Sequence, residues 1–324
     1  MRTSIPVGLM ILGLAGGCGA GDGDNDSGPG SRADDAAGGE ASSPPRTPAF
    51  DDFVGDDPVP RAEERGCEKV DFLYVIDNSP SMVDEQENLA RSFVGFSRVI
   101  EQTLRASDHH IMVVDTDGVA ATDVLDSSPA YYGCEQVLGA GLRFSGSGDC
   151  YVESELAYLE PEQENVAQSF SCLARVGAMG NVESKPIEAL LRATGAIGTE
   201  LQTCNTGFLR DDAILVVTVI TDEDDDDSDG EPEDWKEMLL AAKGGNEQAV
   251  VMLGLISDTH LRQGLPGGPC DATSGLDAPR LQRFAESFEL GSVGSVCAPD
   301  YSEFFAEAVQ TIDTACDVFV PEVY

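Results

Sequence analysis

The sequence has few basic residues: 19 Lys and Arg stand against 59 Asp and Glu, which gives a formal net charge of −40. A nucleic-acid-binding protein needs clustered Lys and Arg to contact phosphate, so this class is excluded. The same shortage argues against docking on anionic lipid through a basic patch. Because 41% of the residues are hydrophobic, the chain can still bury a core, and the acidic excess must lie on surfaces, loops or tails.

Sequence motifs of exported α/β enzymes are also missing. There is no Gly-x-Ser-x-Gly motif, and no Cys–His pair stands out as a catalytic dyad. His109, His110 and His260 match no zinc-binding spacing with the cysteines, and we interpret them as surface or packing residues. A single Trp gives little sign of a sugar-stacking surface. We therefore expect a protein that is not an enzyme.

The first 18 residues have the pattern of an export signal. Arg2 supplies a positive charge, and Ile5–Leu14 is an apolar stretch too short to span a bilayer as a helix. Small residues then lead to Cys18, so the segment resembles a bacterial lipoprotein signal, in which residues 1–17 are removed and Cys18 is lipidated. Ordinary signal cleavage, with Cys18 incidental, is the alternative. We expect an exported protein, anchored by lipid to the bacterial outer membrane or cell surface.

The rest of the chain divides into a linker, a domain and a tail. Residues 19–65 are rich in Gly, Asp, Ser, Ala and Pro, which predicts a disordered acidic linker, because such a segment cannot bury enough apolar surface. Residues 66–318 predict one folded domain, and residues 319–324 a short tail. Within the domain, residues 118–160 are rich in Gly, Ser and Cys, which predicts either an insertion or a set of crosslinked loops, with an edge strand near Leu142–Phe144.

Apolar runs alternate with helical periodicity through the predicted domain. The predicted strands are Val70–Ile76, Ile111–Val114, Ala213–Thr221, Ala249–Ile256 and Ser292–Val296. The predicted helices are Val83–Leu104, Pro161–Val176, Lys185–Ile197, Glu233–Lys243, Ala278–Phe288 and Tyr301–Ala315. Ala213–Thr221 is apolar at nearly every position, which is typical of a central parallel strand covered on both faces. The alternation predicts an α/β fold with a doubly wound, mostly parallel central sheet flanked by helices.

Oxygen ligands follow two of the predicted strands. Asp77, Ser79 and Ser81 come after the first strand, and Asp222 comes directly after the third. In an open α/β sheet, ligands bind outside the carboxyl ends of the strands, so we expect these side chains in one crevice. Carboxylates and hydroxyls are hard ligands that suit Mg²⁺, and neutral hydroxyls leave the ion able to accept an anionic ligand from another molecule. The alternative is that Ser81 and Asp84 only cap a helix.

The pattern Asp-x-Ser-x-Ser after an apolar strand, with a second strand ending in Thr-Asp, resembles the von Willebrand factor type A domain. The segments VDFLYVIDNSPSM and VITDEDD are similar to those of exported bacterial lipoproteins that carry such a domain. The resemblance covers Cys67–Asp317. It implies a metal-ion-dependent adhesion site in which Ser79 and Ser81 bind the ion directly, Asp77 binds through water, and Asp222 is the late acidic ligand. The implied cofactor is Mg²⁺, or Ca²⁺ or Mn²⁺ in its place, and the implied partner is a protein that presents an acidic residue.

The sequence departs from this family's pattern at the middle ligand, where the family places a Thr in a Gly-rich loop before a helix. Residues 177–186 contain no Thr. Ser184 or Glu183 could take the position, and the sequence leaves both open. A Glu would lower the net charge of the site and weaken its attraction for a partner's carboxylate. We interpret Thr116-Asp117, after the second predicted strand, as a turn.

An acidic run follows the third predicted strand: ten of the thirteen residues from Asp222 to Asp234 are Asp or Glu. Asp225, Asp227 and Asp229 have the spacing of the start of an EF-hand loop, although the twelfth position lacks the required Glu. A solvated loop is one interpretation. A loop ordered by additional Ca²⁺ is the other, because so many like charges repel unless cations collect there. The second leads to an alternative function, a Ca²⁺-binding structural surface protein without a metal-dependent partner.

Nine cysteines are a high count for a reducing cytosol and indicate export. With Cys18 set aside, eight remain, which predicts four disulfides. Strands run toward the binding edge of the sheet and helices run back, so Cys67 and Cys316 are expected at the far edge and Cys270 and Cys297 at the binding edge. The predicted pairs are Cys67–Cys316, Cys270–Cys297, Cys134–Cys150 and Cys172–Cys204.

Overall fold

The computed structural model of the chain describes most of the predicted domain. The described residues are 68–99, 108–118, 134, 137–145, 148–181, 183–198, 203–257 and 277–320. The predicted signal, Cys18, the predicted linker and His260 lie outside them. No helix in these ranges combines the length and apolar character needed to cross a bilayer.

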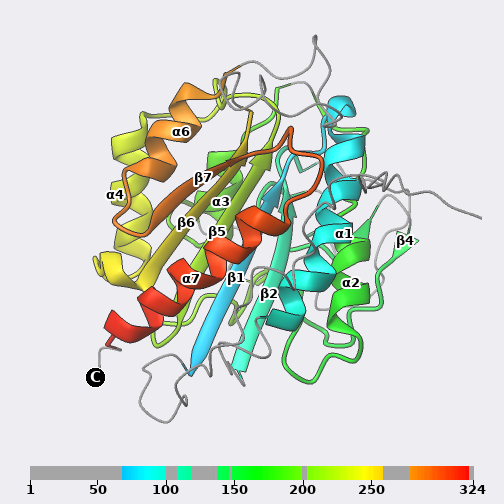
Figure 1. The fold of residues 1–324 in the computed structure, drawn as a ribbon, viewed down its shortest axis with the longest axis horizontal. Helices are drawn as coiled ribbons and strands as arrows, with labels where there is room; N and C mark the ends of the chain where they lie inside the picture. The colour runs from blue at the N-terminus through cyan, green and yellow to red at the C-terminus, as the bar shows by residue number, and fades with distance from the viewer. Residues whose placement is uncertain are drawn as a thin grey trace, which may run out of the picture. The chain divides into compact units, whose positions relative to one another are not determined.

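Five parallel strands form the central sheet, in the order β2-β1-β5-β6-β7 (Figure 1). The strands are β1 (Lys69–Ile76), β2 (Asp108–Asp115), β5 (Ile214–Thr221), β6 (Val250–Ile256) and β7 (Gly291–Ser295). Every residue of β5 is buried, which confirms the prediction of a central strand covered on both faces. The predicted α/β fold with a parallel central sheet is therefore confirmed.

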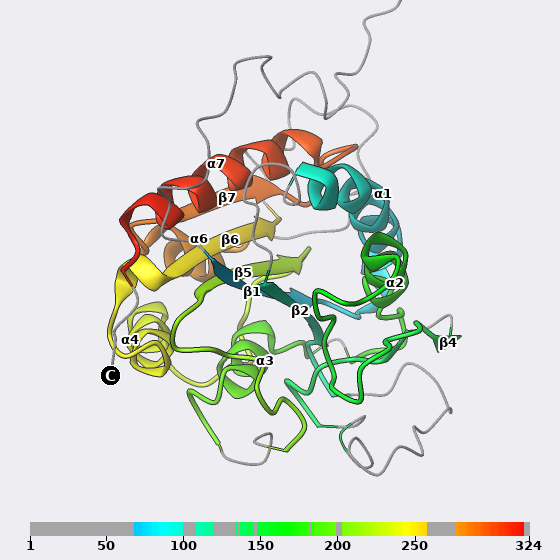
Figure 2. The same cartoon turned by 90° about the horizontal axis from the view of Figure 1, so that it is seen from below.

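Helices cover both faces of this sheet (Figure 2). One face packs against α1 (Val83–Val99), α2 (Val166–Leu173) and α7 (Ser302–Val318). The other face packs against α3 (Pro186–Ala193), α4 (Pro232–Ala242) and α6 (Pro279–Glu286). Helices α2 and α3 are shorter than the sequence predicts. Helix α2 starts only after Asn165, whose left-handed backbone (φ 56°) cannot lie inside a right-handed helix.

Aromatic side chains fill the layer between β1 and its covering helices. Tyr74 of β1 packs against Phe93 of α1 and Phe170 of α2, with ring centroids 5.9 and 4.6 Å away. Phe96, one turn further along α1, stacks on Phe305 of α7 at 4.6 Å. The helical spacing of apolar residues in α1 thus places its aromatic face on the sheet and fixes the start of the helix near the end of β1.

The topology places a switch point, which we call the crevice, between the carboxyl ends of β1 and β5. Helix α1 follows β1 on one face of the sheet, and α4 follows β5 on the other. The two loops therefore diverge at the point where the strand order reverses, which is where open α/β sheets bind ligands. The backbone N–H of Asp77 donates to the carbonyl of Ile220 at 2.9 Å and keeps the two strand ends side by side.

The segment predicted as an insertion covers the free edge of β2. A short strand does lie near the predicted Leu142–Phe144, but it does not join the central sheet, because β3 (Phe144–Ser145) pairs with β4 (Gly148–Asp149) in a separate hairpin. Isolated backbone hydrogen bonds instead cover the edge of β2. Leu142 N donates to Val113 O, and Leu159 exchanges two backbone hydrogen bonds with Ile111. These contacts protect the edge from pairing with another chain.

Two disulfides lie within the described residues, Cys134–Cys204 and Cys150–Cys172, with Cα–Cα distances of 5.7 and 5.4 Å. The predicted pairs Cys134–Cys150 and Cys172–Cys204 are therefore wrong. The observed pairing depends on the tertiary structure, since the β3–β4 hairpin lies against α2 and brings Cys150 to Cys172. Cys297 and Cys316 are also disulfide-bonded, and their predicted partners, Cys270 and Cys67, lie outside the described residues.

Candidate functional site

The crevice brings the predicted ligands of both strand ends together. The hydroxyls of Ser79 and Ser81 lie 3.1 Å apart, and Ser81 Oγ donates to Asp222 Oδ1 at 3.0 Å. Asp77 Oδ1 accepts the backbone N–H of Ser79 at 2.8 Å, which curls the loop after β1 around this carboxylate. The hydroxyl of Ser81 reaches across to Asp222 at the end of β5, which a residue that only caps a helix would not do. The four residues form one hydrogen-bonded group.

The carboxylate of Asp77 is the centre of this group. It is fully buried, and Thr221 Oγ1 donates to its Oδ2 at 2.7 Å. The hydroxyls of Thr116 and Ser184 lie within 3.4 and 3.5 Å of its two oxygens. Burial raises the pKa of Asp77, and the hydrogen bonds from Thr221 and Ser79 act in the opposite direction. A buried carboxylate with this many donors is held in one orientation.

Ser184 and Glu183, which the sequence leaves as alternatives for the middle ligand, have different environments. Ser184 is buried and directs its hydroxyl to Asp77 Oδ2. Glu183 is exposed. The backbone N–H of Lys185 donates to Thr116 O at 2.9 Å, and this contact holds the segment against the end of β2. The geometry favours Ser184.

Thr116-Asp117, predicted as a turn, braces the loop after β1. Thr116 Oγ1 lies 3.2 Å from Asn78 Oδ1, and Asn78 Nδ2 donates to Asp117 Oδ1 at 2.8 Å. The end of β2 therefore contributes to the crevice as a third strand end. The position of Thr116 next to Asp77 follows from the parallel register of β1 and β2, in which Ile76 lies opposite Asp115.

The Gly-rich loop is fastened to the same place by a side chain that the sequence analysis missed. Gln86 Nε2 donates to the carbonyls of Asp77 and Gly177, at 2.9 and 2.8 Å, and Gln86 Oε1 accepts the N–H of Gly177. The N–H of Gly180 donates to Asn78 O at 2.9 Å. A Cβ at Gly180 would lie 2.4 Å from Asn78 Oδ1, so only glycine allows this approach. No motif or periodicity distinguishes Gln86 from other polar residues of α1.

Negative charge is concentrated around the crevice. Glu85 of α1 is buried, and burial, reinforced by Asp222, Asp84 and Asp77, raises its pKa to about 7. Burial also raises the pKa of Glu223, with further contributions from Asp222 and Asp77. A divalent cation among these groups would offset their mutual repulsion. The donor set of carboxylates and hydroxyls consists of hard oxygen ligands, and it fits Mg²⁺, Mn²⁺ or Ca²⁺.

Carboxylates of the acidic run after β5 accept hydrogen bonds from the N-termini of helices. Asp225 is buried, and its Oδ2 accepts the backbone N–H of Ile187 at the start of α3. Asp224 accepts the N–H groups of Arg280 and Leu281 at the start of α6, both at 3.0 Å. Helix N-termini carry unsatisfied N–H groups and partial positive charge, so they stabilise these carboxylates. A capping box at Glu231 begins α4 in the same way.

The three residues of the proposed calcium loop do not converge. Asp225 faces inward, and its oxygens also accept hydrogen bonds from the N–H and hydroxyl of Ser228, whereas Asp227 and Asp229 are exposed. The solvated-loop interpretation is incomplete as well, because Asp225 is buried. Across the described ranges, no three His, Cys, Asp or Glu side chains gather in the manner of a metal site. The crevice instead offers hydroxyls beside its carboxylates.

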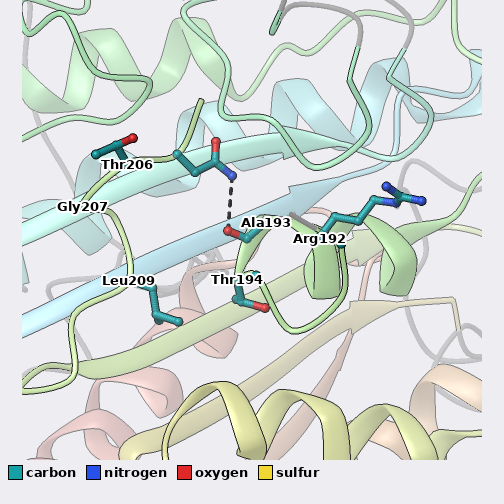
Figure 3. A pocket seen from close by; sticks show the side chains of 9 residues that line it. Arg192, Ala193, Thr194, Thr206, Gly207 and Leu209 are labelled. Carbon is teal, nitrogen blue, oxygen red and sulfur yellow. Dashed lines mark hydrogen bonds between the residues drawn. The ribbon is translucent and has the colours of Figure 1, made fainter. Parts of the chain in front are cut away.

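A pocket of about 220 Å³ lies away from the crevice, beside the C-terminal end of α3 (Figure 3). Asn205 Nδ2 donates to Ala193 O at 3.2 Å and to Gly139 O at 2.9 Å. Thr194 Oγ1 donates to Leu190 O at 3.0 Å. Asn205 thus connects the segments around this pocket, whereas Thr194 bonds within its own helix, and the lining residues include no carboxylate.

No protein-family model and no curated protein matches this chain.

Proposed function

We propose that this chain is an exported, lipid-anchored binding module that engages a protein partner through a divalent metal ion in the crevice. The observation that carries the proposal is the meeting of Asp77, Ser79, Ser81 and Asp222 at the ends of two neighbouring parallel strands. A parallel sheet with helices on both faces is also what the resemblance to the von Willebrand factor type A domain implies. We propose that the chain has the fold of the von Willebrand factor type A domain.

The donor set has the composition that a metal-dependent binding site needs. Ser79 and Ser81 can face one ion, because their hydroxyls are within 3.1 Å of each other. Asp77 would hold the ion through water, and Ser184 would serve as the middle ligand, since it is buried beside Asp77. Mg²⁺ takes six oxygens at about 2.0–2.1 Å, so these groups leave a position for a carboxylate of the partner. The ion would supply the positive charge that an acidic partner requires on this acidic surface.

The alternative is a structural surface protein that binds Ca²⁺ through its acidic run and has no metal-dependent partner. The number of acids in that run favours this alternative. Its weakness is that Asp225 and Asp224 already accept hydrogen bonds from the N-termini of α3 and α6. The crevice is therefore the better supported metal site, and neither candidate function is enzymatic.

The full chain, immobilised and exposed to a cell-surface extract, tests the proposal. Wild type should capture a protein in Mg²⁺ and release it in EDTA. Asp77→Ala should capture nothing above background, whereas Asp211→Ala, which removes an exposed carboxylate at the opposite end of β5, should behave as wild type. Melting curves of both variants show whether they remain folded. Capture by folded Asp77→Ala, or capture by wild type that survives EDTA, would contradict a metal-dependent partner site.

A further inference from the structure

Two exposed apolar side chains, Val83 and Met179, flank the crevice, and we propose that this apolar rim contacts the partner directly. The partner segment would present an Asp or Glu to the ion, apolar side chains next to that acid, and Lys or Arg further out. This inference rests on the proposed function and adds the chemistry of the segment that is recognised.

Exposed large apolar side chains are few in the described residues. They are Val83, Val94, Tyr151, Met179, Val318 and Val320. Met179 is 79% exposed, the largest fraction among them, and Val83 is 55% exposed. Isolated exposed apolar residues are normal on protein surfaces. The position of these two beside the same candidate site is what points to contact with another molecule, because interface centres are enriched in Met and in apolar surface.

Both members of the apolar rim are connected to the loop after β1 that carries Ser79 and Ser81. Val83 follows Ser81 by two residues and begins α1. Met179 directly precedes Gly180, whose N–H donates to Asn78 O. Gln86 ties Gly177, on the other side of Met179, to the carbonyl of Asp77. The backbone under the rim is thus held in place before any partner arrives, which lowers the entropy that binding must overcome.

The charged side chains around the apolar rim determine which residues the outer part of the partner segment should carry. Asp84 is exposed beside Val83, and Glu183 is exposed beside Ser184. Asp226 and Asp227 add further exposed carboxylates after β5. An apolar centre within an acidic surround complements an apolar segment with basic residues at its ends. A partner segment that carried only acids would be repelled everywhere except at the ion.

A random peptide library displayed on phage provides a probe that requires no known partner. The library is incubated with the immobilised full chain in Mg²⁺, and bound phage are eluted with EDTA. The eluted pool should be enriched in peptides with one Asp or Glu, apolar neighbours and outer Lys or Arg. A single enriched peptide is then synthesised and its affinity measured for wild type and for variants. Val83→Ser and Met179→Ser should each weaken binding by about five- to tenfold.

Val94→Ser is the matched control, because Val94 is an exposed valine of the same helix, 43% exposed and eleven residues from Val83. It should leave the affinity unchanged, and Mn²⁺ should bind all three variants as tightly as wild type. Two results would overturn the proposed role of the apolar rim and leave the metal site intact. One is an EDTA-eluted pool that shows no enrichment in apolar residues. The other is an equal affinity for the peptide in Met179→Ser, Val83→Ser and Val94→Ser. If EDTA releases no phage from the immobilised chain, the proposed function itself is overturned.

Discussion

Thr221 Oγ1 donates a hydrogen bond of 2.7 Å to Asp77 Oδ2 and so joins the end of β5 to the end of β1. Both side chains are fully buried. Asp77 Oδ1 meanwhile accepts the N–H of Ser79, so the orientation that Thr221 imposes on the carboxylate also sets the loop carrying the two serines. The residue before Asp222 thus positions the proposed metal ligands that follow the other strand.

Replacing Thr221 with Val keeps the shape of the side chain and removes its donor. We expect Thr221→Val to lower the free energy of unfolding by about 1–3 kcal/mol, because a buried carboxylate oxygen loses a partner. Mn²⁺ affinity, measured by titration calorimetry, should fall several-fold as the loop loosens. Thr221→Ser keeps the hydroxyl and should retain Mn²⁺ affinity. Identical urea-unfolding curves and Mn²⁺ affinities for wild type and Thr221→Val would show that this hydrogen bond has no positioning role.

Gly180→Ala tests the close approach of the Gly-rich loop to the loop after β1. The added methyl would lie 2.4 Å from Asn78 Oδ1 and 2.7 Å from Asn78 O, and part of that contact is backbone. The loop must therefore shift, and we expect weaker Mn²⁺ binding with little change in the far-ultraviolet circular dichroism spectrum. Ala178→Ser, a small change two residues earlier, serves as the control. Wild-type Mn²⁺ affinity in Gly180→Ala would mean that the loop does not depend on this approach.

The acidic run offers a test of capping against calcium binding. Asp225→Ala removes the acceptor at the start of α3 and should lower the free energy of unfolding by about 1–2 kcal/mol, whereas exposed Asp227→Ala should have almost no effect. With the crevice inactivated by Asp77→Ala, adding Ca²⁺ should leave the melting temperature unchanged. A rise in Ca²⁺ relative to EDTA in that variant would favour a calcium-binding loop.

The two described disulfides close loops of different length, with sequence separations of 70 for Cys134–Cys204 and 22 for Cys150–Cys172. In the chain-entropy model, replacing both cysteines of a pair by Ser should cost about 4 kcal/mol for the first and about 3 kcal/mol for the second. Mass spectrometry of unreduced proteolytic peptides checks the pairing itself. Cross-linked peptides joining Cys134 to Cys150 would contradict the structure. Thiol titration of the unfolded, unreduced protein should find at most one free thiol.

Asp71, at the opposite end of β1 from the crevice, should give the stability a pH dependence. It accepts hydrogen bonds from the N and Nε of Arg210, at 2.8 and 2.7 Å, yet burial raises its pKa to about 6. The folded state therefore holds the proton more tightly than the unfolded state, in which an Asp has a pKa of about 4. As pH rises from about 4 to about 6, this contribution to stability is lost.

Urea unfolding of wild type and Asp71→Asn across this pH window measures the effect. The free energy of unfolding of wild type should fall relative to that of the variant as the pH rises. A rise relative to the variant would mean that the ion pair with Arg210 outweighs burial.

The fold could be predicted from the sequence because its strongest signals are local. The apolar run of β5 and the helical spacing of α1 each depend on burial against a sheet, and the structure has both at the predicted places. The strand ends then located Asp77 and Asp222 without further information. Hydrogen-bond partners far apart in the chain left no such signal, as with Gln86 and Gly177 or Asp225 and Ile187. The pairing of Cys150 with Cys172 likewise depends on how a hairpin lies against α2.

A crystal of the full chain soaked in Mn²⁺ tests the central claim most directly, because anomalous scattering locates the ion. The account predicts one strong peak in the crevice, within about 2.0–2.4 Å of Ser79 Oγ and Ser81 Oγ and close to the carboxylates of Asp77 and Asp222. A soaked crystal with an empty crevice, or with its Mn²⁺ peak among the carboxylates of the acidic run instead, would contradict it.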